Sequence, residues 1–142
     1  MTAAAVRPKV GDRLEARSFG PITRTDIVRY QGASGDFNPI HHDETMATAA
    51  GFPTVFSVGM LQAGLLATFA TDCFPAESLR RYATRFKEQC WPDDVLTCEG
   101  VVASTTETAA GLEVVVDLTC SRQTGGTAIE ATAVFLLPPA GS

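Results

Sequence analysis

The chain has 142 residues, of which 45% are hydrophobic and 19% charged, and its formal net charge is −5. This composition is typical of one folded domain and excludes a disordered or fibrous chain. The acidic balance argues against nucleic-acid binding, which needs basic residues to face the phosphates. The longest apolar stretch, residues 58–70, is shorter than the roughly 20 residues of a membrane span. The basic start lacks the apolar segment of a secretory signal. We therefore predict a cytoplasmic, single-domain protein over residues 1–142, with its core at about 10–137.

The first elements expected are a strand and a short helix. Residues Arg13 to Phe19 predict a strand that Gly20-Pro21 closes. Thr23 and Asp26 have the spacing of a capping box, so a helix should begin between them. The helix residues expected to pack inward are Ile27, Val28 and Tyr30.

Two further helices are expected after residue 42. Asp43 can cap a short helix that runs through Ala50 and ends at Gly51. From Ser57 to Asp72 the pattern predicts a longer helix that is apolar almost all round. A helix without a polar face must be buried on nearly every side, and its small residues would let a sheet approach closely.

The second half of the chain predicts strands. Their expected bounds are Leu79 to Lys87, Val95 to Ser104, Leu112 to Arg122, and Thr127 to Leu137. One buried helix followed by four antiparallel strands suggests an α+β fold in which a sheet wraps around the helix.

An acid/base pair lies between the first two helices. Asp36 and His41 are five residues apart, a span of roughly 17 Å if extended. The two side chains can meet only if the chain turns, and Asn38-Pro39 supplies the turn, with the Asn38 side-chain amide as its organiser. A carboxylate and an imidazole can share proton transfer near neutral pH. For such a pair taken alone, a solvated loop with a packed histidine is the commoner arrangement.

The whole string around this pair resembles the signature of the MaoC-like, R-specific enoyl-thioester hydratases of the hotdog superfamily. That signature runs aromatic, short spacer, small residue, Gly-Asp-x-Asn-Pro-aliphatic-His, then five residues and a small residue. The matching positions here are Tyr30, Ser34, Gly35, Asp36, Asn38, Pro39, Ile40, His41 and Ala47. His42 falls at a variable position, so we expect it to be structural. The resemblance extends from about Val10 to Leu137.

The resemblance implies a single hotdog, an antiparallel sheet around a long apolar helix, with Asp36 and His41 as the catalytic pair. The implied enzyme is a hydro-lyase that reversibly hydrates trans-2-enoyl thioesters to R-3-hydroxyacyl thioesters. Its substrate would be a thioester of CoA or of acyl carrier protein, and the chemistry needs no cofactor or metal. The family usually pairs two hotdogs, so a homodimer is the default expectation and a heterodimer stays open.

The start of the central helix is the expected oxyanion site. Unpaired NH groups and the positive dipole end favour a developing anion there, so the Gly59 NH is the expected donor. The family usually has a small residue, His, Gly and Met, whereas this chain has Ser57-Val58-Gly59-Met60. Ser57 could replace the missing histidine as a hydrogen-bond donor, although capping the helix is the commoner role for such a serine.

A second departure lies in Trp91-Pro92-Asp93-Asp94, where the family commonly has a glycine before the Asp that starts the next strand. We expect the turn to be retained in altered form. Trp91 would either pack in the core or border the acyl tunnel, and core packing is the favoured interpretation.

Basic residues gather just after the central helix. If residues 79–87 form a strand, alternation places Arg81, Arg85 and Lys87 on one face. They would either contact the carrier phosphate or protect a solvated edge strand from aggregation, and the two interpretations have equal weight.

The four cysteines are Cys73, Cys90, Cys98 and Cys120. Their spacing contains no Cys-x-x-Cys pair, so they should be buried or half-buried free thiols rather than zinc ligands.

Two other functions remain open. A hotdog thioesterase binds the same acyl thioesters, but such enzymes often carry an acid on the central helix, and residues 57–71 contain no Asp or Glu. A subunit of a heteromeric dehydratase is the other alternative. Retention of both Asp36 and His41 argues against a purely structural subunit, but it is compatible with a catalytic subunit that requires a partner.

Overall fold

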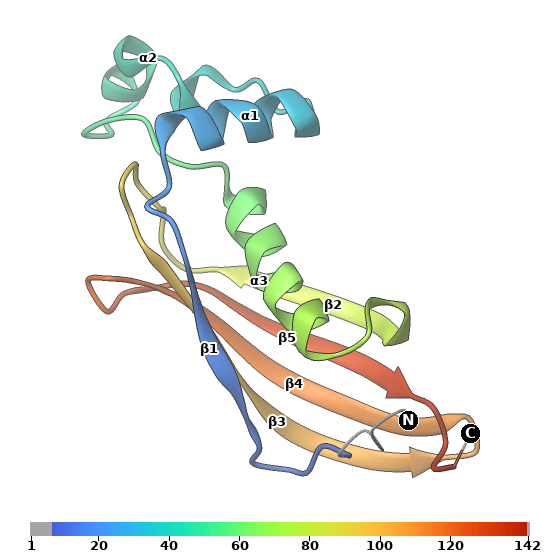
Figure 1. Ribbon diagram of the computed structural model, residues 1–142. Coiled ribbons are helices and arrows are strands. Elements are labelled where there is room, and N and C mark those ends of the chain that lie inside the picture. The colour runs from blue at the N-terminus through green and yellow to red at the C-terminus, as the bar shows by residue number, and fades with distance from the viewer. Residues whose placement is uncertain (1–6, 142) are drawn as a thin grey trace.

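Five antiparallel strands form one curved sheet in the order β1-β3-β4-β5-β2 (Figure 1). The computed structural model describes residues 7–141. The strands are β1 (Arg13–Phe19), β2 (Leu79–Phe86), β3 (Leu96–Thr108), β4 (Gly111–Arg122) and β5 (Thr127–Leu137). This order leaves β1 and β2 at the two edges, where each pairs with a single neighbour.

The two faces of the sheet differ in polarity. Along β4, Val114 and Val116 are fully buried, whereas Glu113 and Asp117 on either side of them are exposed. Successive side chains of a strand point to opposite faces, so this alternation gives an apolar inner face and a solvated outer face.

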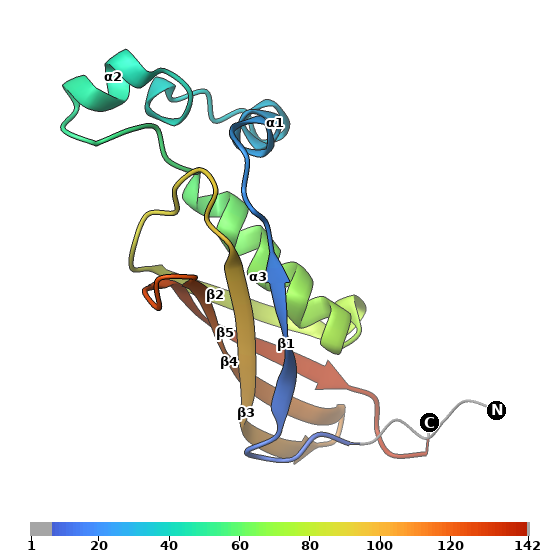
Figure 2. The same ribbon diagram turned by 60° about the vertical axis from the view of Figure 1, so that its left-hand side comes forward.

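The long helix α3 (Gly59–Cys73) lies across the inner face, and the sheet curls around it (Figures 1 and 2). Leu66 and Phe69 of the helix are 0% and 2% exposed and belong to the same apolar core as the inner face of the sheet. The hydroxyl of Tyr82 on β2 donates to the carbonyl of Ala63 at 2.7 Å, which ties the edge strand to the helix. The predicted arrangement of a sheet around an apolar helix is confirmed.

The sheet covers only one side of α3, so the expectation that the helix is buried on nearly every side is wrong. Met60 is 56% exposed, and Gly64 and Thr68, at a spacing of four on the same face, are also exposed. The physical reason is geometric. The sheet of one chain reaches around a single face, and α1 and α2 lie beyond the N-terminal end of α3 rather than along it (Figures 1 and 2).

The overhanging segment contains α1 (Arg24–Ser34), the 3-10 turn η1 (Pro39–His41) and α2 (Glu44–Ala49). Thr23 and Asp26 form the predicted capping box, and the Asp43 side chain caps α2 as expected. Of the three residues expected to face inward, Ile27 is fully buried and Tyr30 is half-buried, but Val28 is 53% exposed. Val28 lies about 100° around the helix from Ile27, which takes it off the buried face.

The predicted bounds of the other elements differ from the observed ones by no more than one residue at most ends, and by more at the end of β3 and the start of α3. β1 and β5 agree with the prediction, but β3 continues to Thr108 instead of ending at Ser104. Its polar end pairs with β4 in a long hairpin, so backbone pairing extends it where the side-chain pattern predicted a loop. The helix α3 begins at Gly59 rather than Ser57. A short 3-10 turn, η2 (Ala76–Ser78), links it to β2. Within residues 7–141, no helix has the length and apolar character to cross a membrane.

Candidate active site

The loop between α1 and α2 carries both residues of the predicted acid/base pair. It begins at Gly35, whose left-handed backbone (φ 77°) ends α1 at little steric cost because glycine has no Cβ. The Asp36 Oδ1 accepts from the Asn38 NH at 3.2 Å. The Asn38 Oδ1 then accepts from the Ile40 NH at 3.2 Å, which starts η1. The chain therefore turns between Asp36 and His41, with Asn38 as the organiser that the sequence predicted.

The ring of His41 is held from one side. His41 is 8% exposed, and its Nδ1 lies 2.7 Å from the carbonyl oxygen of Phe56. A carbonyl can only accept, so Nδ1 must donate and carry the proton. In the neutral ring, Nε2 then keeps its lone pair and can take a proton from a water molecule. The Phe56 ring packs edge-on against the imidazole, with 5.0 Å between centroids.

Asp36 and His41 share one turn but do not bond directly to each other. Asp36 is exposed, and none of the hydrogen bonds in the described part of the chain joins its carboxylate to the His41 ring. Two groups that hold a water molecule between them must stand farther apart than one hydrogen bond. The absence of a direct bond is therefore compatible with joint action on a water molecule.

Gln31 is a site residue that sequence analysis missed. It lies in the last turns of α1, is 2% exposed, and donates from Nε2 to the carbonyls of Asp36 at 2.9 Å and Asn38 at 3.1 Å. Its Oε1 lies 3.0 Å from Nδ1 of His42. The signal was available in the sequence, because Gln31 follows Ile27 by four residues and so lies on the buried face of the helix.

Ser57 does not cap α3, so the favoured expectation for this residue is wrong. The helix starts two residues later with Val58 at its N-cap and no side-chain cap. Ser57 is still in extended chain, its NH bonded to the Cys90 carbonyl at 2.8 Å. Its hydroxyl donates instead to Oε1 of Gln62 at 2.7 Å, and both residues are 2% exposed.

The start of α3 presents free donors, as predicted for Gly59. Because the first NH groups of a helix have no partner within it, those of Gly59 and Met60 need partners from elsewhere. Within residues 7–141, neither NH has a hydrogen-bonding partner.

A pocket of about 300 Å³ lies beside these donors. Phe56 lines the pocket and its carbonyl holds His41, so the pocket adjoins the turn that carries Asp36 and His41. A Cβ at Gly59 would come within 3.0 Å of the Phe86 ring, which shows how closely the ring approaches the helix start. Other residues in the pocket wall include Ser57, Gln62 and Lys87.

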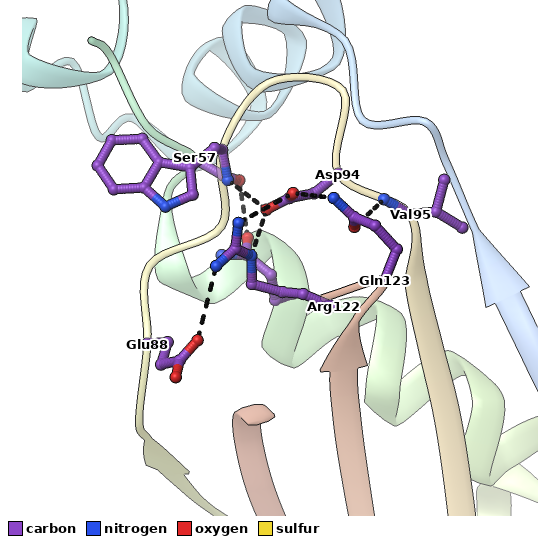
Figure 3. A network of polar contacts seen from close by, with 8 residues as sticks. Ser57, Glu88, Asp94, Val95, Arg122 and Gln123 are labelled. Atoms are coloured by element: carbon purple, nitrogen blue, oxygen red, sulfur yellow. Dashed lines mark hydrogen bonds and ion pairs between the residues drawn. The ribbon is translucent and has the colours of Figure 1, made fainter. Parts of the chain in front are cut away.

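A buried ion pair between Asp94 and Arg122 lies at one end of the sheet, next to this pocket (Figure 3). Asp94 is 3% exposed and accepts from Arg122 Nε at 2.7 Å and Nη2 at 3.2 Å, and from Gln123 Nε2 at 2.7 Å. The Trp91 NH adds a fourth bond at 2.8 Å. Burial alone would raise the pKa of Asp94, but these bonds outweigh it and hold the pKa below its usual value.

The same loop retains the turn in altered form, as predicted. Asp93 has a φ of 72°, the left-handed conformation that the family's glycine would adopt and that aspartate tolerates. Trp91 is half-buried and packs edge-on against Phe56, with ring centroids 5.8 Å apart. Trp91 therefore supports Phe56, which carries the carbonyl that holds His41.

The structure separates the three basic residues. Tyr82 faces α3, so alternation along β2 places Arg81 and Arg85 on the outer face of the sheet, where both are exposed. Lys87 follows the end of the strand and lines the pocket beside Gly59, with its Nζ 3.8 Å from Glu130.

The thiols are free, but they are not all buried. Cys90, Cys98 and Cys120 are fully buried, whereas Cys73, at the end of α3, is exposed, contrary to the expectation. Burial raises the pKa of the Cys90 thiol to about 12, so this group stays protonated near neutral pH. No group of three or more metal-ligating side chains occurs among residues 7–141.

Comparison with known proteins finds a family model that matches most of the chain. The family model described as "MaoC like domain" matches residues 5–123. The 3-hydroxyacyl-thioester dehydratase X of Mycobacterium tuberculosis is 40% identical over 65 residues, which cover 46% of this chain and 22% of that protein. The chain thus matches about a fifth of that relative's length.

Solved structures share the fold at low sequence identity. The (R)-hydratase from A. caviae involved in PHA biosynthesis has a TM-score of 0.81 at 24% identity, over 96% of this chain and 100% of that one. A chain of the ChsH1-ChsH2 complex from Mycobacterium tuberculosis has a TM-score of 0.78 at 22% identity, over 92% of this chain and 100% of that one. At these identities the similarity shows the fold alone.

Proposed function

The chain belongs to the family of MaoC-like domains, and on that premise we propose that it reversibly hydrates trans-2-enoyl thioesters to (R)-3-hydroxyacyl thioesters. Asp36 and His41 are the catalytic pair. The observation that carries the proposal is the bond from His41 Nδ1 to the Phe56 carbonyl, which leaves Nε2 as the basic nitrogen. The name of the M. tuberculosis relative supports the same reaction class.

In the hydration direction, water adds its oxygen to C3 of the substrate and a proton is added at C2. The pair Asp36 and His41 holds the water, removes its proton and returns a proton to C2. Negative charge develops meanwhile on the thioester oxygen. The free NH groups of Gly59 and Met60, at the positive end of α3, are suited to stabilise it. No cofactor enters this scheme.

An apolar groove of about 450 Å³ provides room for the acyl chain. It lies between α1 and α3, and Ile22, Tyr30, Leu61 and Leu65 contribute to its walls. Since α1 leads from this groove to Asp36, an acyl chain lying there would place its thioester end toward the catalytic turn. This position supports an acyl thioester as the substrate class.

Lys87 is the basic residue best placed for a carrier phosphate, because it lines the pocket next to Gly59. Arg81 and Arg85 lie on the outer face of an edge strand, so they would act only on parts of CoA or of acyl carrier protein that reach around β2. Turnover of a CoA thioester or of the matching acyl-carrier-protein thioester distinguishes the two carriers.

We also propose that the chain works as a dimer. The edge strand β2 has one unpaired side, and the exposed Phe86 and Met60 lie at its end and on the neighbouring helix face. A second copy is the default partner. A heterodimer in which this chain is the catalytic subunit is the alternative, and the ChsH1-ChsH2 complex gives it a structural precedent. A monomer by light scattering that retains full hydratase activity would refute both.

A thioesterase is less well supported. The single acid of α3, Asp72, lies in its last turn and pairs with Arg17 of β1, far along the helix from Gly59. That carboxylate is therefore occupied and distant from the free NH groups.

The decisive experiment follows the loss of enoyl-thioester absorbance with crotonyl-CoA and a longer enoyl-CoA, and with the matching acyl-carrier-protein thioesters. Asp36→Asn and His41→Ala should each abolish turnover while the far-ultraviolet circular dichroism stays unchanged. Asp117→Asn, a charge removal on the outer sheet face, should leave the rate at the wild-type value. A folded wild type that turns over none of these substrates, alone or with a candidate partner subunit, would refute the proposal.

A further inference from the structure

We propose that Gln31 is a positioning residue for this reaction, because its buried amide sets the conformation of the loop that carries Asp36 and His41. The inference rests on the proposed function, and it names a residue that acts through others and does not itself touch the substrate.

The amide of Gln31 bridges the catalytic turn. Its Nε2 has two N–H donors, and the two acceptors, the carbonyls of Asp36 and Asn38, are two residues apart. Holding both carbonyls fixes the Asp36–Phe37 and Asn38–Pro39 peptide groups. The Asp36 side chain and the Asn38 side chain then project from backbone whose direction the amide sets.

Little else holds this segment. Residues 32–38 are all exposed, and Phe37 in the middle is 65% exposed, so side-chain packing does not fix the loop. The other bonds are local and join residues at most four apart, such as those from the Asp36 NH to Ser34, the Asn38 NH to Asp36 and the His41 NH to Asn38. Among residues 7–141, the only side-chain hydrogen bonds that connect the turn to buried residues are those of the Gln31 amide and that of His41 to Phe56.

The orientation of the amide follows from its partners. Both carbonyls accept only, so the NH₂ end must face them and Oε1 must face His42. The Nδ1 of His42 therefore donates to Oε1. All three bonds favour this orientation of the amide over the flipped one, so the Gln31 side chain is fixed in a single orientation.

Packing alone does not explain a glutamine here. Gln31 follows the fully buried Ile27 by one helical turn and is itself 2% exposed, so an apolar side chain would serve a purely structural role. Burying an amide is unfavourable unless its hydrogen bonds are satisfied. The three bonds to the loop and to His42 offset that cost and give the position its role.

The test uses Gln31→Met, which keeps the length of the side chain but has no donor. We expect kcat to fall on the order of 100-fold through misplacement of the catalytic pair, with KM changed by less than about 3-fold because the acyl groove and carrier contacts lie elsewhere. Ser78→Ala is the matched control. It removes another buried hydrogen bond, from the Ser78 hydroxyl to Pro75 at 2.6 Å, at the opposite end of α3, and should leave kcat unchanged.

Gln31→Glu supplies a signature that a space-filling role would not produce. A protonated glutamic acid can donate to one carbonyl, whereas the carboxylate repels both. The ratio of the variant's kcat to the wild-type kcat should therefore rise as the pH is lowered. A ratio that is flat with pH, or a wild-type kcat in Gln31→Met, would overturn the inference.

Amide hydrogen exchange of the free enzyme separates this inference from the proposed function. In Gln31→Met the Asn38 and Ile40 amides should exchange at least about 10-fold faster, since opening of the loop exposes them, and in Ser78→Ala they should not. Unchanged exchange would refute the positioning role even if the wild type had no hydratase activity. Faster exchange with an undiminished kcat would also refute the positioning role, since the hydrogen bonds of Gln31 would then have no effect on the reaction.

Discussion

Replacing Asp94 with alanine should destabilise the protein more than any surface substitution, because it removes the centre of the network beside the pocket. The carboxylate is 3% exposed and accepts from Arg122, Gln123 and the Trp91 NH. Without it, the Arg122 guanidinium, whose side chain is 18% exposed, keeps only Glu88 at 3.6 Å as an acidic neighbour among the described residues.

The expected loss of stability on replacing Asp94 can be bounded from these contacts. Four hydrogen bonds reach the carboxylate, and one to a charged group contributes about 1.5–3 kcal/mol. They are not additive, since Gln123 and the loop can rebind water, whereas breaking one partner from a buried ion pair costs about 3–5 kcal/mol. We expect the free energy of unfolding at pH 7 to fall by about 3–5 kcal/mol in Asp94→Ala and by about 2 kcal/mol in the isosteric Asp94→Asn.

The stability that Asp94 contributes should decrease as the pH is lowered. The folded pKa of Asp94 is lowered, because the bonds from Arg122, Trp91 and Gln123 outweigh burial. Its stabilisation is therefore fully present above the unfolded pKa, which is about 3.9, and is lost as the pH falls through the lower folded value. The gap between wild type and Asp94→Asn should be constant from pH 7 to about pH 5 and should narrow below about pH 4.

Urea denaturation followed by circular dichroism measures these values at each pH. Asp93→Asn is the matched control, since Asp93 is exposed and asparagine also tolerates its left-handed backbone. Its unfolding free energy should stay within about 0.5 kcal/mol of the wild type. A loss below about 1 kcal/mol for Asp94→Ala at pH 7, or a gap that widens on acidification, would refute the reasoning.

Three further outcomes follow from single contacts. Gly59→Ala should lower the hydratase rate at least about 10-fold, because the methyl enters the pocket wall 3.0 Å from Phe86. The same change should alter the unfolding free energy by less than about 1 kcal/mol, since the exposed ring can shift, and a normal rate would contradict the oxyanion assignment. Tyr82→Phe should cost about 1 kcal/mol in urea denaturation, because it removes the 2.7 Å bond to Ala63, and an unchanged midpoint would argue that this bond is not formed. Ellman's reagent at pH 8 should modify one thiol, the exposed Cys73, in the native protein and all four after denaturation; rapid modification of more would show that the other thiols are accessible.

Much of the fold was readable from the sequence because it depends on short-range chemistry. The capping box of Thr23 and Asp26 and the cap at Asp43 connect residues two or three apart, so the side-chain types alone predict them. The turn at Asn38-Pro39 is local in the same way. The strands of the second half follow from alternation, which failed only where the polar end of β3 continued the hairpin.

Within the site, the sequence determined the residue types and the turn. The motif identified Asp36 and His41 with their spacing, and the apolar pattern located the helix whose first NH groups are free. A small change in how the helices pack would not alter these features, because each depends on residues close together in the sequence.

The remaining features depend on tertiary structure. The carbonyl that holds His41 belongs to Phe56, fifteen residues away, and Asp94 bonds to side chains 28 and 29 residues along the chain. The uncovered face of α3 and the outward direction of Arg81 and Arg85 depend on how far one sheet curls. Side-chain types fix hydrogen bonds between neighbours in the chain, whereas distant partners meet only where the packing of the sheet against α3 brings their backbones together.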